Sequence, residues 1–207
     1  MVIRLQTIDE HTRPDHSYLD ADDECYYVLE YAARQKPPYD STSDLIFNLK
    51  KPPDRKGKPE YFYKERDIQR AGNLLRTVLN PEWLKSVTIV PMPCSKIAPH
   101  PLYDDRLVQV LACMTRGLAC DIRELVAQTE SLESFHDDSR LPPEQLMDYY
   151  KLNEELCGRC EPRAVALFDD MLTTGSHFKA MKATIRKRWP EVSVCGVFIA
   201  RRYFPKE

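Results

Sequence analysis

After residue 60, short runs of consecutive apolar residues alternate with longer stretches in which apolar residues recur every three or four positions. The runs are typical of strands covered on both faces, and the longer spacing is typical of amphipathic helices. The pattern therefore predicts strands and helices in alternation. The predicted strands span residues 87–90, 122–126, 164–168 and 192–200, and the predicted helices span residues 61–79, 107–114, 143–156 and 174–188.

The first 60 residues show a different organisation. Strand-like runs occupy residues 2–8 and 26–31, and Ser43 with Asp44 is suited to cap a short apolar helix. Residues 51–60, KPPDRKGKPE, combine prolines, a glycine and basic residues without an apolar anchor. This composition indicates a surface loop.

The alternation of strand and helix predicts an α/β fold with an open, mainly parallel sheet flanked by helices. We expect residues 61–207 to form this core and residues 1–60 to form an amino-terminal segment, or hood, that ends in the basic, proline-rich loop at 51–60. Ligands of such sheets bind beyond the carboxyl ends of the strands. The turns from strand to helix are therefore the places to search for a site.

Composition narrows the class of protein. A length of 207 residues with 43% hydrophobic content suffices for one domain with a sizeable core. Charged residues make up 30% of the chain but nearly cancel, with a formal net charge of −2, so no overall charge attracts nucleic acid or an anionic membrane. The polar start, the lack of a membrane-length apolar run and the odd cysteine count of seven lead us to expect a cytoplasmic protein without a membrane partner.

The most informative turn follows the predicted strand at residues 164–168. Asp169 and Asp170 end the apolar run, and a loop with the sequence Thr-Thr-Gly-Ser at 173–176 opens the next helix. The start of a helix presents free N–H groups and a partial positive charge, which suits a phosphate group. Gly175 lets the backbone approach an anion closely, and the hydroxyls of the loop add donors.

The two carboxylates need a different partner, because they cannot bind a phosphate themselves. Adjacent carboxylates are suited to accept hydrogen bonds from neighbouring sugar hydroxyls, or to hold Mg²⁺ directly or through water. An acidic pair followed by a phosphate loop therefore predicts a site for a ribose 5-phosphate group. The alternative is an ordinary strand end and helix cap, which explains each residue alone but not their order.

The segment FDDMLTTGSHF resembles the fingerprint of type I phosphoribosyltransferases. The resemblance implies binding of phosphoribosyl pyrophosphate (PRPP) with Mg²⁺ as cofactor, an acidic pair on the ribose hydroxyls, and a loop around the 5′-phosphate. It also implies catalytic roles for Asp169 and Asp170, with Asp170 as the base toward an incoming nitrogen. The PRPP-binding residues carried over by position are Asp169, Asp170, Met171, Leu172, Thr173, Thr174, Gly175 and Ser176.

Weaker similarity extends to the ComF-like branch of that family. The P-x-P pattern after the first core strand and the LIFNLK segment at 45–50 are similar to this branch, whereas residues 103–106 read YDDR where the branch carries an arginine-rich R-G-[FY]-N. The branch's amino-terminal cysteine cluster is also missing. The resemblance implies that pyrophosphate binds at the turn after the first core strand and that a variable hood binds the acceptor. The candidate pyrophosphate residues are Cys94, Ser95, Lys96 and Arg106, with Arg140 as a further cation.

Several interpretations stay open. The leading one is a Mg²⁺-dependent phosphoribosyltransferase with a nitrogenous acceptor, and the alternative is a PRPP- or nucleotide-sensing module that acts with a partner protein or nucleic acid. The family implies a homodimer. Residues 50–66, which are basic and contain aromatics, could contact nucleic acid or form a solvated loop, and His136 could contact a ligand or lie in a lid. Cys157 and Cys160 lack a second ligand pair, so no metal site is predicted.

Overall fold

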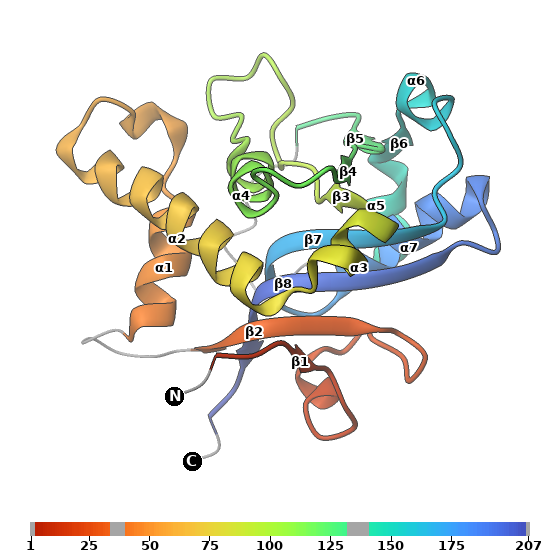
Figure 1. Cartoon of the computed structure of the whole chain (residues 1–207), viewed down its shortest axis with the longest axis horizontal. Coiled ribbons are helices and arrows are strands. Elements are labelled where there is room, and N and C mark those ends of the chain that lie inside the picture. Colours follow the sequence, from red (N-terminus) through yellow and green to blue (C-terminus); the bar gives the residue numbers. More distant parts are fainter. Residues whose placement is uncertain (1–2, 34–39, 132–140, 206–207) are drawn as a thin grey trace.

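The computed structural model describes residues 3–33, 40–131 and 141–205. Its main feature is a six-stranded sheet in the order β1-β2-β8-β7-β3-β4, shown in Figure 1. Only β1 runs antiparallel to its neighbour, and each remaining neighbouring pair is parallel. The strands are β1 (Gln6–Thr7), β2 (Cys25–Ala32), β3 (Thr88–Pro91), β4 (Asp121–Ile122), β7 (Ala164–Leu172) and β8 (Ser193–Tyr203).

Helices connect the parallel strands and flank the sheet. In Figure 1, α3 lies in front of β7 and β8, and α7 lies behind them. The buried rings of Phe178 on α7 and Phe198 on β8 meet edge to face, with 6.5 Å between their centroids. The helices are α1 (Ser41–Leu49), α2 (Phe62–Val78), α3 (Pro81–Ser86), α4 (Arg106–Met114), α5 (Pro143–Asp148), α6 (Glu154–Cys157) and α7 (Ser176–Arg188).

The α/β class and the mainly parallel, helix-flanked sheet are confirmed. Strands form at five of the predicted places, and the helices predicted at 61–79, 107–114 and 174–188 correspond to α2, α4 and α7. The strand predicted at 164–168 is longer than expected, because β7 continues to Leu172 and pairs with β8 beyond the acidic pair. The acidic residues therefore lie within the paired part of the strand.

Three predictions were wrong. The cap of α1 is Asp40, whose side chain accepts a hydrogen bond from Ser43 N, and not Ser43 with Asp44, which lie inside the helix. The run at 122–126 does not form one strand, because β4 ends at Ile122 and a separate strand β5 (Val126–Gln128) begins after a short link. The predicted helix at 143–156 breaks after α5, and β6 (Tyr150–Leu152) pairs antiparallel with β5 in a second sheet. Asn153 then caps α6, because its side chain accepts a hydrogen bond from Leu156 N. Pairing between segments outweighed the helical spacing of the apolar residues.

The first 60 residues contribute to the main sheet. Strand β2 pairs in parallel with β8 from Cys25 to Ala32, and β1 covers only part of the strand expected at 2–8. The division predicted at residue 60 is therefore not a break in the sheet. The basic loop at 51–60 carries two short 3₁₀ turns, Pro53–Arg55 and Pro59–Tyr61, that lead into α2.

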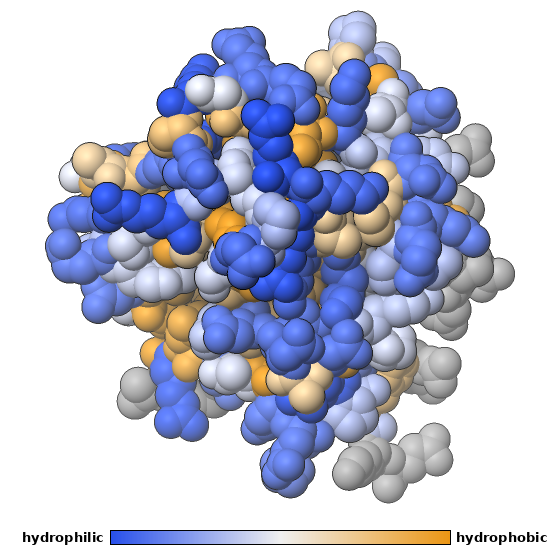
Figure 2. All heavy atoms as spheres, turned by 90° about the vertical axis from the view of Figure 1, so that its right-hand side faces the viewer, coloured by the Kyte–Doolittle hydropathy of each residue, from blue (hydrophilic) through white to orange (hydrophobic). Residues whose placement is uncertain are grey.

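The surface is mixed in character. On the face drawn in Figure 2, hydrophobic atoms lie in small groups between hydrophilic side chains. Over the described ranges, none of the helices has both the length and the apolar character that crossing a membrane requires.

Candidate functional site

A cavity of about 540 Å³ lies where β3 and β7 end, at the carboxyl edge of the parallel sheet. Segments that are distant in sequence form its walls, among them the end of α1, the turn after β3, the start of α4, and the end of β7 with its loop. The residues that line it are Lys50, Met92, Pro93, Cys94, Ser95, Asp104, Arg106, Leu107, Gln128, Leu141, Leu146, Asp169, Asp170, Met171, Leu172, Thr173, Gly175, His177, Phe178 and Phe198.

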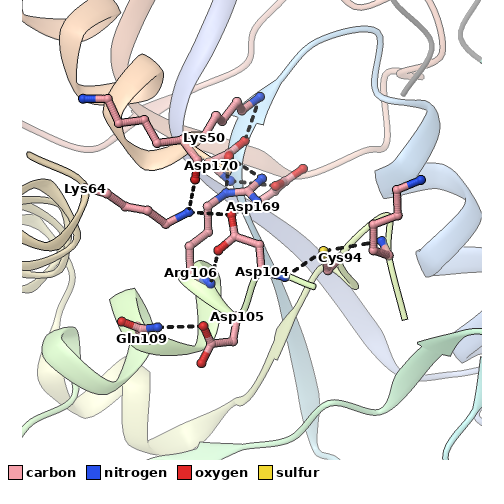
Figure 3. Close-up of polar contacts among 11 residues, drawn as sticks. Lys50, Lys64, Cys94, Asp104, Asp105, Arg106, Gln109, Asp169 and Asp170 are labelled. Carbon is pink, nitrogen blue, oxygen red and sulfur yellow. Dashed lines mark hydrogen bonds and ion pairs between the residues drawn. The ribbon is translucent and has the colours of Figure 1, made fainter. Parts of the chain in front are cut away.

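The buried carboxylate of Asp170 is held by two cations (Figure 3). Arg106 donates from Nε and Nη2 to Oδ2 of Asp170, at 3.0 and 2.9 Å. Lys50 Nζ lies 3.3 Å from the other oxygen, Oδ1. Both oxygens of this carboxylate are therefore occupied by side chains of the chain itself.

The ion pair extends away from the cavity into a buried network. Asp104 Oδ2 accepts hydrogen bonds from Arg106 Nη1 at 3.0 Å and from Lys64 Nζ at 2.6 Å. Lys64 is almost fully buried and also donates to the backbone oxygen of Lys51 at 2.7 Å. Each buried charge thus has a partner, which is the condition for burying charge without a large penalty. The network fixes Arg106 beside Asp170.

Asp169 has a different environment from its neighbour. Its Oδ1 accepts a hydrogen bond from Asp170 N at 2.7 Å, and among the described residues no hydrogen-bond donor reaches Oδ2. The side chain lines the cavity, and part of it is exposed to solvent. Asp169 is therefore the open carboxylate of the pair.

The pKa values of Asp169 and Asp170 therefore differ. Burial and the adjacent charge of Asp170 raise the pKa of Asp169 to about 7, against opposing effects of Lys50 and Arg106. For Asp170, burial alone would raise the pKa, but Lys50 and Arg106 outweigh it and lower the pKa to about 2. At neutral pH the pair holds one firmly ionised carboxylate and one near its midpoint.

The loop after β7 has the backbone of a tight turn. Gly175 adopts φ of 86° and precedes the first residue of α7, Ser176. Thr173 and Gly175 line the cavity, whereas Thr174 and Ser176 are not among its lining residues. The hydroxyls of Thr174 and Ser176 lie 3.3 Å apart, so they contact each other. The loop thus presents backbone to the cavity more than hydroxyl groups.

The predicted pyrophosphate residues divide into two groups. Cys94, Ser95 and Arg106 line the cavity, and Cys94 Sγ accepts a hydrogen bond from Asp104 N at 3.3 Å. Lys96 does not line it, and Arg140 lies outside the described residues. Arg106 reaches the cavity but is engaged with carboxylates, which raise its pKa against the effect of burial.

Sequence reasoning placed Lys50 in the basic segment 50–66 and did not predict that it lines the cavity. This residue caps the carboxyl end of α1, and its side chain remains 42% exposed although it lines the cavity. Lys50 is the last residue of the LIFNLK segment, which is similar to a helix of the ComF-like branch. This position is the signal in the sequence that could have pointed to Lys50.

The opposite wall carries less charge. Leu141 and Leu146 line it together with Gln128, which donates to the backbone oxygen of Ser95 at 3.2 Å. Tyr150 Oη and His177 Nδ1 form a hydrogen bond of 2.6 Å at its edge. This wall is suited to a flatter, less charged part of a ligand.

Other candidate residues lie apart from the cavity. Cys160 Sγ accepts a hydrogen bond from Arg123 Nη2 at 3.0 Å, and the described residues place neither Cys157 nor Cys160 in a cluster of metal ligands. His136, proposed as part of a lid, lies outside the described residues. The described part also holds an acidic cluster at Asp20, Asp22 and Asp23, in which Asp20 and Asp23 accept hydrogen bonds from Lys179 and Lys182 of α7.

The chain was compared with known proteins. No family model matches it, and no curated protein matches it.

Proposed function

We propose that this chain is a Mg²⁺-dependent phosphoribosyltransferase, which transfers the phosphoribosyl group of PRPP to a nitrogenous acceptor. One observation carries the proposal. An open carboxylate, a tight loop before a long helix, the turn after β3, and the cation Arg106 at the start of α4 line a single cavity at the carboxyl edge of a parallel sheet. Each of these parts suits one group of PRPP. The ribose hydroxyls would bind at Asp169, the 5′-phosphate at the loop, and the pyrophosphate at the turn after β3.

The residues fit a magnesium ion. Asp169 offers a carboxylate oxygen that no donor of the described residues reaches, and Mg²⁺ is commonly held by one or two carboxylates together with water and substrate phosphates. When bound there, the ion would neutralise charge on the leaving pyrophosphate. The protein itself would bind the ribose, orient its anomeric carbon and hold the leaving group.

Substrate binding requires an exchange of partners at Asp170. Its oxygens already accept from Arg106 and face Lys50, so a ribose hydroxyl must share or replace one of these cations. The displaced cation would then lie beside the incoming pyrophosphate, which needs positive charge. Lys50, which is more exposed than Arg106, is the cation we expect to move.

The divergent acidities favour Asp169 over Asp170 as the general base. A base works best when its pKa lies near the operating pH. Asp169, with a pKa of about 7, meets this condition, whereas Asp170 is held ionised by its two cations with a pKa of about 2. The base role expected for Asp170 therefore moves to Asp169 in this proposal, and Asp170 becomes the residue that orients the ribose and the two cations.

Calorimetric titration with PRPP, with and without Mg²⁺, tests the proposal. We expect saturable binding that depends on Mg²⁺ and is lost in Asp169→Asn. Screening of nitrogenous acceptors for release of pyrophosphate then tests transfer. Absence of binding at millimolar PRPP would rule out the proposed substrate.

A second function has a specific observation in its favour. Arg106, the cation that lines the pyrophosphate side, is committed to Asp170 and Asp104, which leaves little free charge for a departing pyrophosphate. This arrangement suits a module that senses PRPP or a nucleotide without turning it over. Binding without pyrophosphate release for any acceptor would favour this sensor.

A sensor would need a partner, and the surface around residues 47–66 is one place for it. Phe47 and Phe62 are 70% and 63% exposed, and Lys51 Nζ lies 5.0 Å from the ring centroid of Tyr63. Exposed rings next to cations suit stacking on bases of single-stranded nucleic acid. Salt-sensitive binding of a single-stranded oligonucleotide that is weakened in Phe62→Ala would support this form of the second function. Retained binding in that variant would exclude it.

A further inference from the structure

The phosphate loop is contacted from outside the cavity by residues 16–19, which we call the strap. His16 Nδ1 donates a hydrogen bond to the backbone oxygen of Thr173, and Tyr18 N donates to the oxygen of Thr174 at 2.9 Å. Leu19 packs so closely on Gly175 that a Cβ added there would lie 2.7 Å from Leu19 Cδ2. The cavity's lining contains no strap residue among those the structure describes.

These two hydrogen bonds set the direction of two successive peptide groups. The planar trans peptide places its C=O and N–H on opposite sides. Because the oxygens of Thr173 and Thr174 point to the strap, the N–H groups of Thr174 and Gly175 point away from it. Within the part of the chain that the structure describes, neither N–H group has a hydrogen-bond partner. Unpaired backbone donors at the start of a helix are suited to an anion.

The strap is itself held by the elements on each side of the loop. Asp15, the residue before it, pairs with Arg201 of β8 at 2.9 Å. Asp23, just beyond it, accepts from Lys179 and Lys182 of α7 at 2.8 and 2.6 Å. The strap is therefore tied to β8 and to α7, and its contact with the loop does not depend on the loop alone.

His16 is the least ordinary residue of the strap. Its side chain is 1% exposed, and its second ring nitrogen, Nε2, has no partner among the described residues. Burial lowers the pKa of His16, so the neutral ring with its proton on Nδ1 is the form that donates to Thr173. A buried phenylalanine would fill the same space without an unpaired nitrogen, so packing alone does not account for a histidine here.

We propose that His16 is a positioning residue: it turns the carbonyl of Thr173 outward and so, together with Tyr18, keeps the N–H groups of Thr174 and Gly175 pointing away from the strap and available to the ligand's phosphate. The inference rests on the proposed function, because it assigns the residue that orients the loop of that same site. The inference predicts that PRPP affinity depends more on the N–H donor of His16 than on the volume of its ring.

Two variants separate donor from volume. His16→Phe keeps a ring and loses the donor, whereas His16→Asn keeps a donor near the position of Nδ1 and loses the ring. The measurements are the affinity for PRPP with Mg²⁺ and hydrogen exchange at the Tyr18 amide, which reports the strap-to-loop contact without any ligand. Melting temperatures show whether each variant is folded.

We expect His16→Phe to weaken PRPP binding about tenfold, the loss that goes with one oriented hydrogen bond, and to speed exchange at Tyr18. His16→Asn should stay within about threefold of the unchanged chain, since the donor is retained. Equal affinities in all three proteins, or a larger loss in His16→Asn than in His16→Phe, would overturn the inference.

The unchanged protein supplies a further test if His16→Phe does not fold. PRPP should slow hydrogen exchange at the Thr174 and Gly175 amides, and binding without such protection would also overturn the inference. Failure of the proposed function has a different signature. In that case the unchanged protein binds no PRPP, whereas exchange at Tyr18 still separates His16→Phe from His16→Asn.

Discussion

Arg106 directs two N–H groups, Nε and Nη2, at a single oxygen of Asp170, at 3.0 and 2.9 Å. This leaves the other oxygen to Lys50, at 3.3 Å. The two carboxylates of the acidic pair therefore differ in role. Asp170 is buried, ionised and paired with two cations, and Asp169 is the carboxylate that remains open to the cavity. The predictions below follow from this difference and from the geometry of the loop.

Asp170→Asn should lower the stability of the protein more than Asp169→Asn does, although both changes should weaken PRPP binding. Removing the charge of Asp170 takes away one of the two carboxylate partners of Arg106 and the ion-pair partner of Lys50, which we expect to lower the free energy of unfolding by about 3 kcal/mol. Asp169→Asn should cost little at pH 8. Denaturant unfolding measures both values, and equal losses in the two variants would contradict this difference in role.

The raised pKa of Asp169 determines how its contribution to stability changes with pH. Its favourable contribution to stability is fully present below the unfolded value of 3.8 and is lost as the pH rises through about 7. At pH 8 the ionised group is therefore unfavourable beside Asp170, and its replacement by a neutral amide removes that repulsion.

PRPP affinity in the presence of Mg²⁺ should rise with pH through about 7. Below that pH Asp169 is protonated in the free protein and must lose its proton to hold a metal ion, so affinity should change by up to about tenfold per pH unit. Calorimetry between pH 5.5 and 8.5, both ~1.5 units from the midpoint, measures this. PRPP also titrates, so ribose 5-phosphate without metal serves as the reference ligand. A pH profile of the same slope for both ligands would argue against Asp169 as the responsible group.

Lys50 and Lys96 form a matched pair of lysines, because one lines the cavity and the other does not. We expect Lys50→Gln to weaken binding of PRPP or of pyrophosphate about tenfold, through loss of a charge-assisted contact. Lys96→Gln should change affinity by less than about threefold. Titration of each variant with pyrophosphate gives the comparison, and the reverse order of effects would place the leaving group elsewhere.

Gly175→Ala should be more harmful than Gly57→Ala, although both glycines have a similar φ, 86° and 87°. A side chain at either position costs about 1 kcal/mol for the left-handed backbone. At Gly57 no atom lies within 4 Å of an added Cβ, whereas at Gly175 the Cβ would lie 2.7 Å from Leu19.

Thermal melting of both alanine variants tests the extra cost at Gly175. Adding Leu19→Ala to Gly175→Ala makes room for the new methyl group, so the double variant should lose less stability than the sum of the single changes. Strict additivity would show that Leu19 does not restrict this position.

The sequence by itself determined the α/β class, most of the element order, and the segment that bears Asp169, Asp170 and the loop. These are local properties: apolar periodicity reports which faces are covered, and an acidic pair before a Thr-Thr-Gly-Ser loop is a contiguous pattern. The same local logic misplaced the helix at 143–156, because pairing of β5 with β6 is a contact between separate segments.

Only the tertiary structure decided which charges meet. Lys50 and Arg106 reach Asp170 from two separate segments, and nothing in the order of residues says that Arg106 would bind a carboxylate. The strap is likewise invisible in the sequence, since His16 and Thr173 are 157 positions apart. The pKa values of Asp169 and Asp170 depend on burial and on neighbouring charges, and both are set by folding. Two adjacent, identical side chains differ in pKa because Arg106 and Lys50 pair directly with Asp170 and not with Asp169.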